Sequence, residues 1–262
     1  MSKLLLSRRR FIGMGAAGIS SVTLGGCDQF DFVANRDSGV REYLEKANTL
    51  TYRVHRLLMR EGALAPEYSE SEIRQGQRPN GSRDPDSFEY LALRDSDFSD
   101  YRLTVTGLVE QEKRYSLAEL RNMPSRTQVT RHDCVEGWSC IANWTGVPLS
   151  RLLDEVKLKP AARYLVFHCY DTLDGTSGQT PYCESCDLID ARHRQTILAY
   201  GLNGQALPVA NGAPIRLRIE RALGYKQPKY VHTIEAVAAF SHIGGGKGGF
   251  WEDLGYDWYA GI

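Results

Sequence analysis

Short apolar runs bounded by turn residues recur between residues 100 and 240, and they do not alternate regularly with helices. Residues 101–106 alternate polar and apolar side chains and end at Gly107, which predicts a half-buried strand. Asn203-Gly204 lies between two apolar runs and predicts a tight hairpin. A doubly wound parallel sheet requires strand–helix alternation, so the pattern instead predicts an α+β fold with mixed β-sheets.

Other elements follow from local patterns. Further strands are predicted at residues 128–131, 164–169, 197–202, 215–219 and 230–240. Ser116 and Glu119 form a capping box that opens a short helix, and Pro124 ends it. Helices are also predicted at 41–60, 148–156 and 187–193, and the first of them is expected to pack on the domain. Residues 66–87, rich in Pro, Gly, Ser and Asp, predict an irregular connector.

The N-terminus has the pattern of an export signal. The sequence SRRRFI at residues 7–12 precedes a stretch, 11–24, that is too short and too weakly apolar to span a membrane. It resembles a twin-arginine signal, which exports proteins already folded, and an ordinary signal peptide is the alternative. Small residues before Cys27 resemble a lipoprotein cleavage box, so a lipid anchor at Cys27 is a second expectation. We therefore predict a periplasmic protein with a signal at 1–26, a tether and helix at 27–77 and the main domain at 78–262.

The charge balance limits the kinds of partner that the chain can bind, and the cysteine spacing limits the cross-links that it can form. The chain has 32 basic and 32 acidic residues, and the basic residues of the first 26 positions have no acidic counterpart there. The remainder is therefore not basic, which argues against a nucleic-acid partner. Of the six cysteines, Cys183 and Cys186 could form a short disulfide in an oxidising compartment. Half of a zinc site is the alternative, but no second CxxC pair accompanies them.

The segment TRHDCVEGWS, residues 130–139, is the most informative stretch for chemistry. Cys134 follows a predicted strand, and positive charge on Arg131 and His132 would favour its thiolate. A thiolate is both a nucleophile and a soft metal ligand. From these residues alone, an inert buried cysteine, a Cys134–His132 thiol hydrolase and a metal ligand all remain open.

Several motifs together point to one family. CVEGWS at 134–139 is followed by WTGVPL at 144–149, Asn203-Gly204, NGAPIRL at 211–217 and GYKQPK at 224–229. In order and spacing this set resembles the sulfite-oxidase family, particularly its bacterial periplasmic branch of protein-methionine-sulfoxide reductases. The resemblance covers roughly residues 78–240. It implies a sulfite-oxidase-like molybdopterin-binding domain that holds molybdenum–molybdopterin, with Cys134 as the protein ligand to the metal.

The resemblance also assigns cofactor contacts. They fall on Asn80, Arg83, Asp84, Cys169, Asn211, Arg216, Gln227, Pro228 and Lys229. Cys169 departs from the family pattern, which has a threonine there, and His168 beside it could substitute. Lys226 is a further candidate. His132 is predicted to act in catalysis as a proton relay, because histidine titrates near neutral pH.

The implied function is a molybdenum-pterin-dependent oxidoreductase. It would transfer an oxygen atom or two electrons on a small or protein-bound substrate, of sulfite or sulfoxide type, with a membrane-bound haem protein or other electron carrier as partner. The chain ends soon after the matched region and has no CxxCH haem motif, so we expect a monomeric catalytic subunit without a C-terminal immunoglobulin-like dimerisation domain. The thiol hydrolase and a non-enzymatic lipoprotein binding scaffold are the alternatives.

The C-terminal tail is rich in aromatic residues. They are Phe250, Trp251, Tyr256, Trp258 and Tyr259. We expect this tail to wrap the domain, and a rim for a substrate or redox partner is the alternative.

Overall fold

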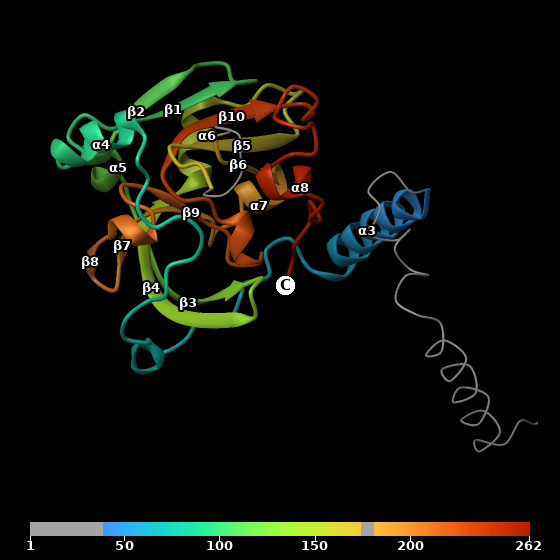
Figure 1. Ribbon diagram of the computed structural model, residues 1–262, viewed down its shortest axis with the longest axis horizontal. Coiled ribbons are helices and arrows are strands. Elements are labelled where there is room, and N and C mark those ends of the chain that lie inside the picture. Colours follow the sequence, from blue (N-terminus) through green and yellow to red (C-terminus); the bar gives the residue numbers. More distant parts are fainter. Residues whose placement is uncertain (1–38, 174–180) are drawn as a thin grey trace, which may run out of the picture. The chain divides into compact units, whose positions relative to one another are not determined.

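The computed structural model describes residues 39–173 and 181–262 (Figure 1). One compact unit runs from Tyr52 to Ile262. The predicted export signal and Cys27 lie outside the described residues. The predicted boundary after residue 77 stays a prediction.

Two β-sheets form the framework of this unit (Figure 1). The first has the order β2-β1-β10-β5-β6 and consists of β1 (Arg102–Gly107), β2 (Lys113–Ser116), β5 (Tyr164–Cys169), β6 (Cys183–Asp187) and β10 (Val231–Val237). The second has the order β3-β4-β7-β8 and consists of β3 (Arg126–Cys134), β4 (Trp138–Pro148), β7 (Ile197–Leu202) and β8 (Gln205–Ala206), with β9 (Arg216–Arg218) also paired to β7. The β1–β10 pair is parallel and the remaining pairs are antiparallel. The predicted α+β fold with mixed sheets is confirmed.

Short helices connect the strands. They are α4 (Phe88–Asp95), α5 (Leu117–Asn122), α6 (Leu149–Val156), α7 (Leu188–Ala191) and α8 (Phe250–Asp253), with 3-10 turns η2 (Glu70–Glu72), η3 (Val209–Asn211) and η4 (Gly224–Lys226). The capping box of Ser116 and Glu119 opens α5 as predicted. Helix α6 buries Leu149, Leu152 and Leu153, which lie on one helical face.

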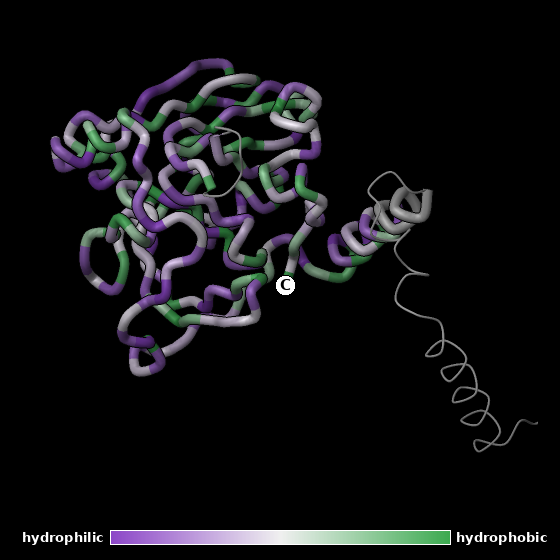
Figure 2. The backbone as a smooth tube through the Cα atoms, in the orientation of Figure 1, coloured by the Kyte–Doolittle hydropathy of each residue, from purple (hydrophilic) through white to green (hydrophobic). Residues whose placement is uncertain are grey.

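The two sheets share one hydrophobic core. Leu103 and Phe167 of the first sheet belong to the same buried cluster as Val147, Leu198 and Leu217 of the second. Figure 2 shows hydrophilic and hydrophobic residues mixed along the strands, as expected where one side of a strand packs on the core. This shared core fixes the ends of strands from both sheets relative to each other.

Strand β6 corrects the prediction for the cysteine pair. Cys183 and Cys186 are three residues apart on this strand, so they point to opposite faces and pack into different clusters. All five cysteines in the described part of the chain are free and buried. The predicted short disulfide is therefore wrong. A zinc site has no support either, because no three His, Cys, Asp or Glu residues gather in a metal-binding group within residues 39–173 and 181–262.

Helix α3 (Gly39–Leu58) matches the helix predicted at 41–60. In its second half, Tyr52 donates a hydrogen bond to Asp187 and Arg56 pairs with Asp187 and Asp190. Val54 and Leu57 are 40% and 83% exposed. The end of the helix, residues 52–58, thus contacts β6 and α7 through polar side chains and leaves Val54 and Leu57 exposed. Among the described helices, none combines the length and hydropathy that crossing a membrane requires.

Candidate functional site

A pocket of about 420 Å³ opens where β3 ends and the segment after η4 begins. Its lining comes from stretches that are far apart in the sequence: 80–82, 134–136, 224–229 and 250–256, together with Asp171, Leu173 and Tyr182. Of the residues predicted for the site, the pocket brings together Asn80, Cys134, Gln227, Pro228 and Lys229.

Cys134 is the last residue of β3, and its side chain is 8% exposed. Strand alternation places it on the same buried face as His132, and Gly137, with a φ of 82°, turns the chain back into β4. Burial raises the pKa of the Cys134 thiol. Arg131 points to the exposed side and pairs with Asp133 at 2.8 Å. Arg131 therefore does not supply the positive charge that the sequence suggested.

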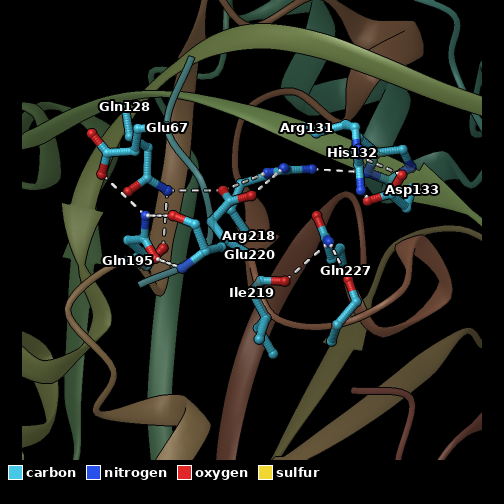
Figure 3. A network of polar contacts seen from close by, with 12 residues as sticks. Glu67, Gln128, Arg131, His132, Asp133, Gln195, Arg218, Ile219, Glu220 and Gln227 are labelled. Atoms are coloured by element: carbon cyan, nitrogen blue, oxygen red, sulfur yellow. Dashed lines mark hydrogen bonds and ion pairs between the residues drawn. The ribbon is translucent and has the colours of Figure 1, made fainter. Parts of the chain in front are cut away.

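His132 belongs to a buried polar chain (Figure 3). Its Nδ1 lies 2.8 Å from Nη1 of Arg218, and Arg218 pairs with both carboxylate oxygens of Glu220. Glu220 also accepts a hydrogen bond from Gln128 at 2.8 Å. Burial, then the charge of Arg218, holds the pKa of His132 well below its usual range. The imidazole is therefore neutral and accepts a hydrogen bond at Nδ1.

The opposite edge of the same ring faces backbone. A Cβ atom added to Gly224 would lie 2.5 Å from His132 Nε2, and the Gln227 side chain also interacts with this imidazole. His132 does not line the pocket, and no hydrogen bond joins it to Cys134 within the described parts of the chain. A hydrolytic Cys134–His132 pair has no support in this geometry. The proton-relay role of His132 stays a prediction, and a neutral ring behind the pocket wall does not favour it.

Lys229 and Asp171 are two ionisable groups that line the pocket. Nζ of Lys229 donates to the backbone oxygens of Ser82 and Ala210. Burial and the nearby Arg216 lower the pKa of Lys229 to about 7. Asp171 accepts a hydrogen bond from the Ser82 hydroxyl at 2.5 Å, and burial raises its pKa to about 6. Its second carboxylate oxygen has no partner among the described residues.

Arg216 lies behind this pair and holds the pocket's backbone. It donates to the backbone oxygens of Asn211 at 3.0 Å and Gln227 at 3.1 Å, and its guanidinium stacks over Trp144. Burial lowers the pKa of Arg216 to about 9. Asn211 and Arg216 therefore support the segment that carries Gln227 and Lys229, but neither lines the pocket.

Three other residues predicted to contact the cofactor do not line the pocket. Arg83 is exposed and Asp84 pairs with Arg94 on the surface. Cys169 is buried in the core, 3.8 Å from the backbone oxygen of Phe167. His168, the suggested substitute for Cys169, pairs with Glu235 at 2.9 Å on the other face of β5, so that substitution is wrong.

Lys226 also departs from its predicted role. Its ammonium is buried between the carboxylates of Glu184, at 2.8 Å, and Glu252. Lys226 therefore does not assist in the pocket. It fixes α8 and β6 to η4.

Sequence reasoning missed part of the lining. Asp171 was not predicted, although a carboxylate two residues after a buried strand is a recognisable signal. Glu136 lies inside the CVEGWS motif and was not assigned a role. Trp251 and Tyr256 were noted only as part of an aromatic tail, and the structure places both in the pocket wall.

Comparison with known proteins identifies the family of this chain. A family model described as an oxidoreductase molybdopterin binding domain matches residues 90–242. An Azospira oryzae protein, named as a protein-methionine-sulfoxide reductase subunit, YedZ1, is 36% identical over 259 residues, which is 98% of this chain and 88% of that protein. The protein-methionine-sulfoxide reductase catalytic subunit MsrP of Ralstonia nicotianae is 35% identical over 144 residues, 52% of this chain and 44% of MsrP.

One solved structure is also similar. The sulfane dehydrogenase SoxCD from Paracoccus pantotrophus aligns with a TM-score of 0.47 and 24% identity, over 53% of this chain and 39% of that one.

Proposed function

Because this chain belongs to the family of oxidoreductase molybdopterin-binding domains, we propose that it reduces sulfoxides in the pocket that contains Cys134. Family membership makes the chain a molybdopterin-dependent oxidoreductase. One observation carries the finer proposal. A cysteine thiol reaches a pocket whose other lining is mostly apolar and whose few polar groups include atoms without partners.

The residues present fit a molybdenum-pterin cofactor. Cys134 offers a soft sulfur ligand, and its side chain is nearly enclosed. A pterin needs donors and acceptors for its ring nitrogens and a cation for its phosphate. Oδ1 of Asp171 is buried without a partner among the described residues, and Lys229 is the nearby cation. We propose that Asn80, Gln227, Pro228 and Lys229 hold the cofactor.

Cofactor contacts at Arg83, Asp84, Cys169, Asn211 and Arg216 remain predictions. Asn211 and Arg216 would act by holding the backbone of the pocket segment.

When bound, the cofactor supplies the two-electron exchange and the site for oxygen-atom transfer. The overall reaction takes one sulfoxide, two protons and two electrons from a carrier, and it releases the thioether and water. The chain must therefore hold protons near the sulfoxide oxygen. Asp171 and Lys229, with pKa values of about 6 and about 7, are the pocket groups that can exchange a proton near neutral pH. The apolar remainder of the lining excludes water from the reacting atoms.

The charges of the pocket favour a neutral substrate over sulfite. Its described lining contains one cation, Lys229, two carboxyl groups, Glu136 and Asp171, and no arginine. A sulfite anion would lose hydration here without enough positive charge to replace it. A sulfoxide is neutral and does not face this penalty. Two relatives are named as protein-methionine-sulfoxide reductase subunits, which supports a sulfoxide on a methionine side chain.

We also propose export and a membrane partner. The SRRRFI segment supports the twin-arginine route to the periplasm, and Cys27 supports a lipid anchor. The five described cysteines are free and buried, so a chain that folds before export would keep them from pairing in an oxidising compartment. A monomeric catalytic subunit would receive electrons from a membrane-bound haem protein or another carrier.

Metal and substrate analysis test the proposal. Protein made in a molybdate-replete host should contain about one molybdenum and one pterin per chain, and with reduced viologen it should reduce methionine sulfoxide. Protein without molybdenum and pterin would overturn the cofactor assignment, and acylation of Cys134 by esters would then support the hydrolase. Sulfite oxidation with no sulfoxide reduction would overturn the assigned substrate.

A further inference from the structure

The C-terminal segment forms one wall of the pocket, and it lies outside the region that the family model matches. The match ends at residue 242, whereas Phe250, Trp251, Leu254 and Tyr256 all line the pocket with Cys134. The side chains of this wall, which we call the 250–256 wall, are apolar apart from the Tyr256 hydroxyl and the Trp251 indole N–H. It therefore lies outside the matched cofactor-binding domain, although the Azospira oryzae relative aligns over 98% of this chain.

A buried ion cluster holds the wall in place. Glu252 of α8 and Glu184 of β6 both bind the Lys226 ammonium, and the three side chains are at most 5% exposed. Lys226 directly precedes Gln227, which lines the pocket. The cluster thus fixes the backbone of the 250–256 wall to the segment that faces the proposed cofactor.

Hydrogen bonds and ring contacts also hold the 250–256 wall in place. Asp253 accepts hydrogen bonds from the backbone N–H groups of Gly245, at 2.6 Å, and Lys247, at 3.1 Å. The ring of Tyr256 packs against Trp251 at 5.0 Å and against Tyr225 at 5.4 Å, between centroids. Side chains with so many contacts lose little freedom when a ligand binds, so the wall offers a preformed apolar surface.

We infer that the 250–256 wall selects sulfoxides that carry a bulky apolar arm, and that Trp251 and Leu254 are the residues that contact this arm. The inference rests on the proposed sulfoxide reduction and adds the class of substrate to it. A preformed apolar wall gains by burying an apolar group, and aromatic rings also contact sulfur favourably. A small sulfoxide leaves that wall in contact with water and gains no binding free energy from it.

The test compares two sulfoxides that share the reacting group. With reduced viologen as donor, kcat/KM is measured for methyl phenyl sulfoxide and for dimethyl sulfoxide on the molybdenum-loaded full chain. Trp251→Ala is the test variant and Leu254→Ala the second, milder one. Trp258→Ala is the matched control, because Trp258 belongs to the same tail but lines a different, smaller cavity.

Binding is measured separately from turnover. Calorimetric titration with methyl phenyl sulfone and dimethyl sulfone, which serve as unreduced probes with the same two organic groups on sulfur, reports the affinity of each variant. We expect Trp251→Ala to lose about tenfold in kcat/KM and in affinity for the phenyl compounds, and to keep its values for the dimethyl compounds. Leu254→Ala should lose less, and Trp258→Ala should keep the wild-type ratio.

The outcomes separate the inference from the proposed function. If the wild type reduces both sulfoxides but the ratio is unchanged in Trp251→Ala and Leu254→Ala, the inference is overturned and sulfoxide reduction stands. The same conclusion follows if Trp258→Ala changes the ratio as much as Trp251→Ala does. A wild-type protein that carries molybdenum and reduces methionine sulfoxide but neither of these compounds would overturn the inference alone, and one that reduces none of the three would overturn both.

Discussion

Nδ1 of His132 lies 2.8 Å from Nη1 of Arg218. His132 comes two residues before Cys134, which lines the pocket. A guanidinium can only donate, so His132 accepts at Nδ1 and carries its proton on Nε2. Arg218 in turn binds Glu220 at 2.5 Å, and both side chains are fully buried. The strand that ends at Cys134 is thus anchored by a buried chain of polar contacts.

Removing the centre of this chain should be strongly destabilising. Arg218→Met leaves the Glu220 carboxylate buried without its cation, and we expect a loss of about 3–5 kcal/mol in the free energy of unfolding. Urea denaturation followed by circular dichroism measures it. Arg192→Met is the control, because the Arg192–Asp154 pair is exposed and should contribute at most about 1 kcal/mol. Equal losses in the two variants would show that the buried chain does not stabilise the fold.

The close approach at Gly224 gives a second prediction. A methyl group there would lie 2.5 Å from His132 Nε2 and 3.3 Å from the Asp133 backbone oxygen, so η4 would have to move away from β3. We expect Gly224→Ala to lower the free energy of unfolding by about 1–3 kcal/mol. Gly62→Ala is the control, since a Cβ at Gly62 meets nothing within 4 Å. The measurement is the same urea titration, and a Gly224→Ala protein as stable as Gly62→Ala would contradict the packing described here.

The buried carboxyl group of Asp171 should make the free energy of unfolding depend on pH. Burial raises its folded-state pKa to about 6, above the value of about 3.9 expected in the unfolded chain. The folded protein therefore binds the proton more tightly, and the associated stability is present below pH 4 and lost as the pH rises through 6. The amide of Asp171→Asn does not ionise, so this variant does not lose that stability as the pH rises. From pH 4 to pH 7, the stability of this variant should rise relative to wild type by about 2–3 kcal/mol.

Thermal and urea unfolding of both proteins at pH 4 and pH 7 measure this difference. The Ser82 hydrogen bond is stronger to the ionised carboxylate and lowers the pKa of Asp171, so its effect is already contained in the folded-state pKa of about 6. A stability difference that does not vary with pH would mean that Asp171 is not desolvated in the folded protein.

Most of the fold could be predicted because local patterns decided it. Strands β5 and β7 have the predicted bounds, and Asn203 and Gly204, with φ values of 50° and 74°, form the predicted turn between β7 and β8. Strand β6 could not be predicted, because all five of its residues are buried although three are Glu, Ser and Asp. Its burial depends on partners distant in sequence, such as Lys226 for Glu184. No local pattern contains that information.

The candidate site was predictable only where a motif carried it. Cys134, Gln227 and Lys229 lie in matched motifs, and the pocket contains all three. Arg216 also lies in a motif, but its side chain is turned inward to backbone oxygens, and a sequence does not report that direction. Trp251 reaches the pocket because a buried ion cluster holds α8, which is again a long-range contact.

The last prediction concerns the thiol itself and uses a second cysteine as its control. Cys134→Ala removes the proposed metal ligand from the pocket, whereas Cys140→Ala removes a buried thiol opposite His132 on β4 that does not line it. Loss of groups that merely orient a metal's ligands lowers affinity or activity by about 10–100-fold, so loss of the ligand should lower sulfoxide reduction by more than about 100-fold. The proposed pterin contacts at Gln227 and Lys229 are unchanged in Cys134→Ala, and pterin should still be recovered with this variant. Cys140→Ala should keep its molybdenum and its turnover, at some loss of stability from the cavity it leaves. Pterin fluorescence, metal analysis and viologen-linked turnover measure these quantities, and a Cys134→Ala protein with wild-type turnover would remove Cys134 from the mechanism.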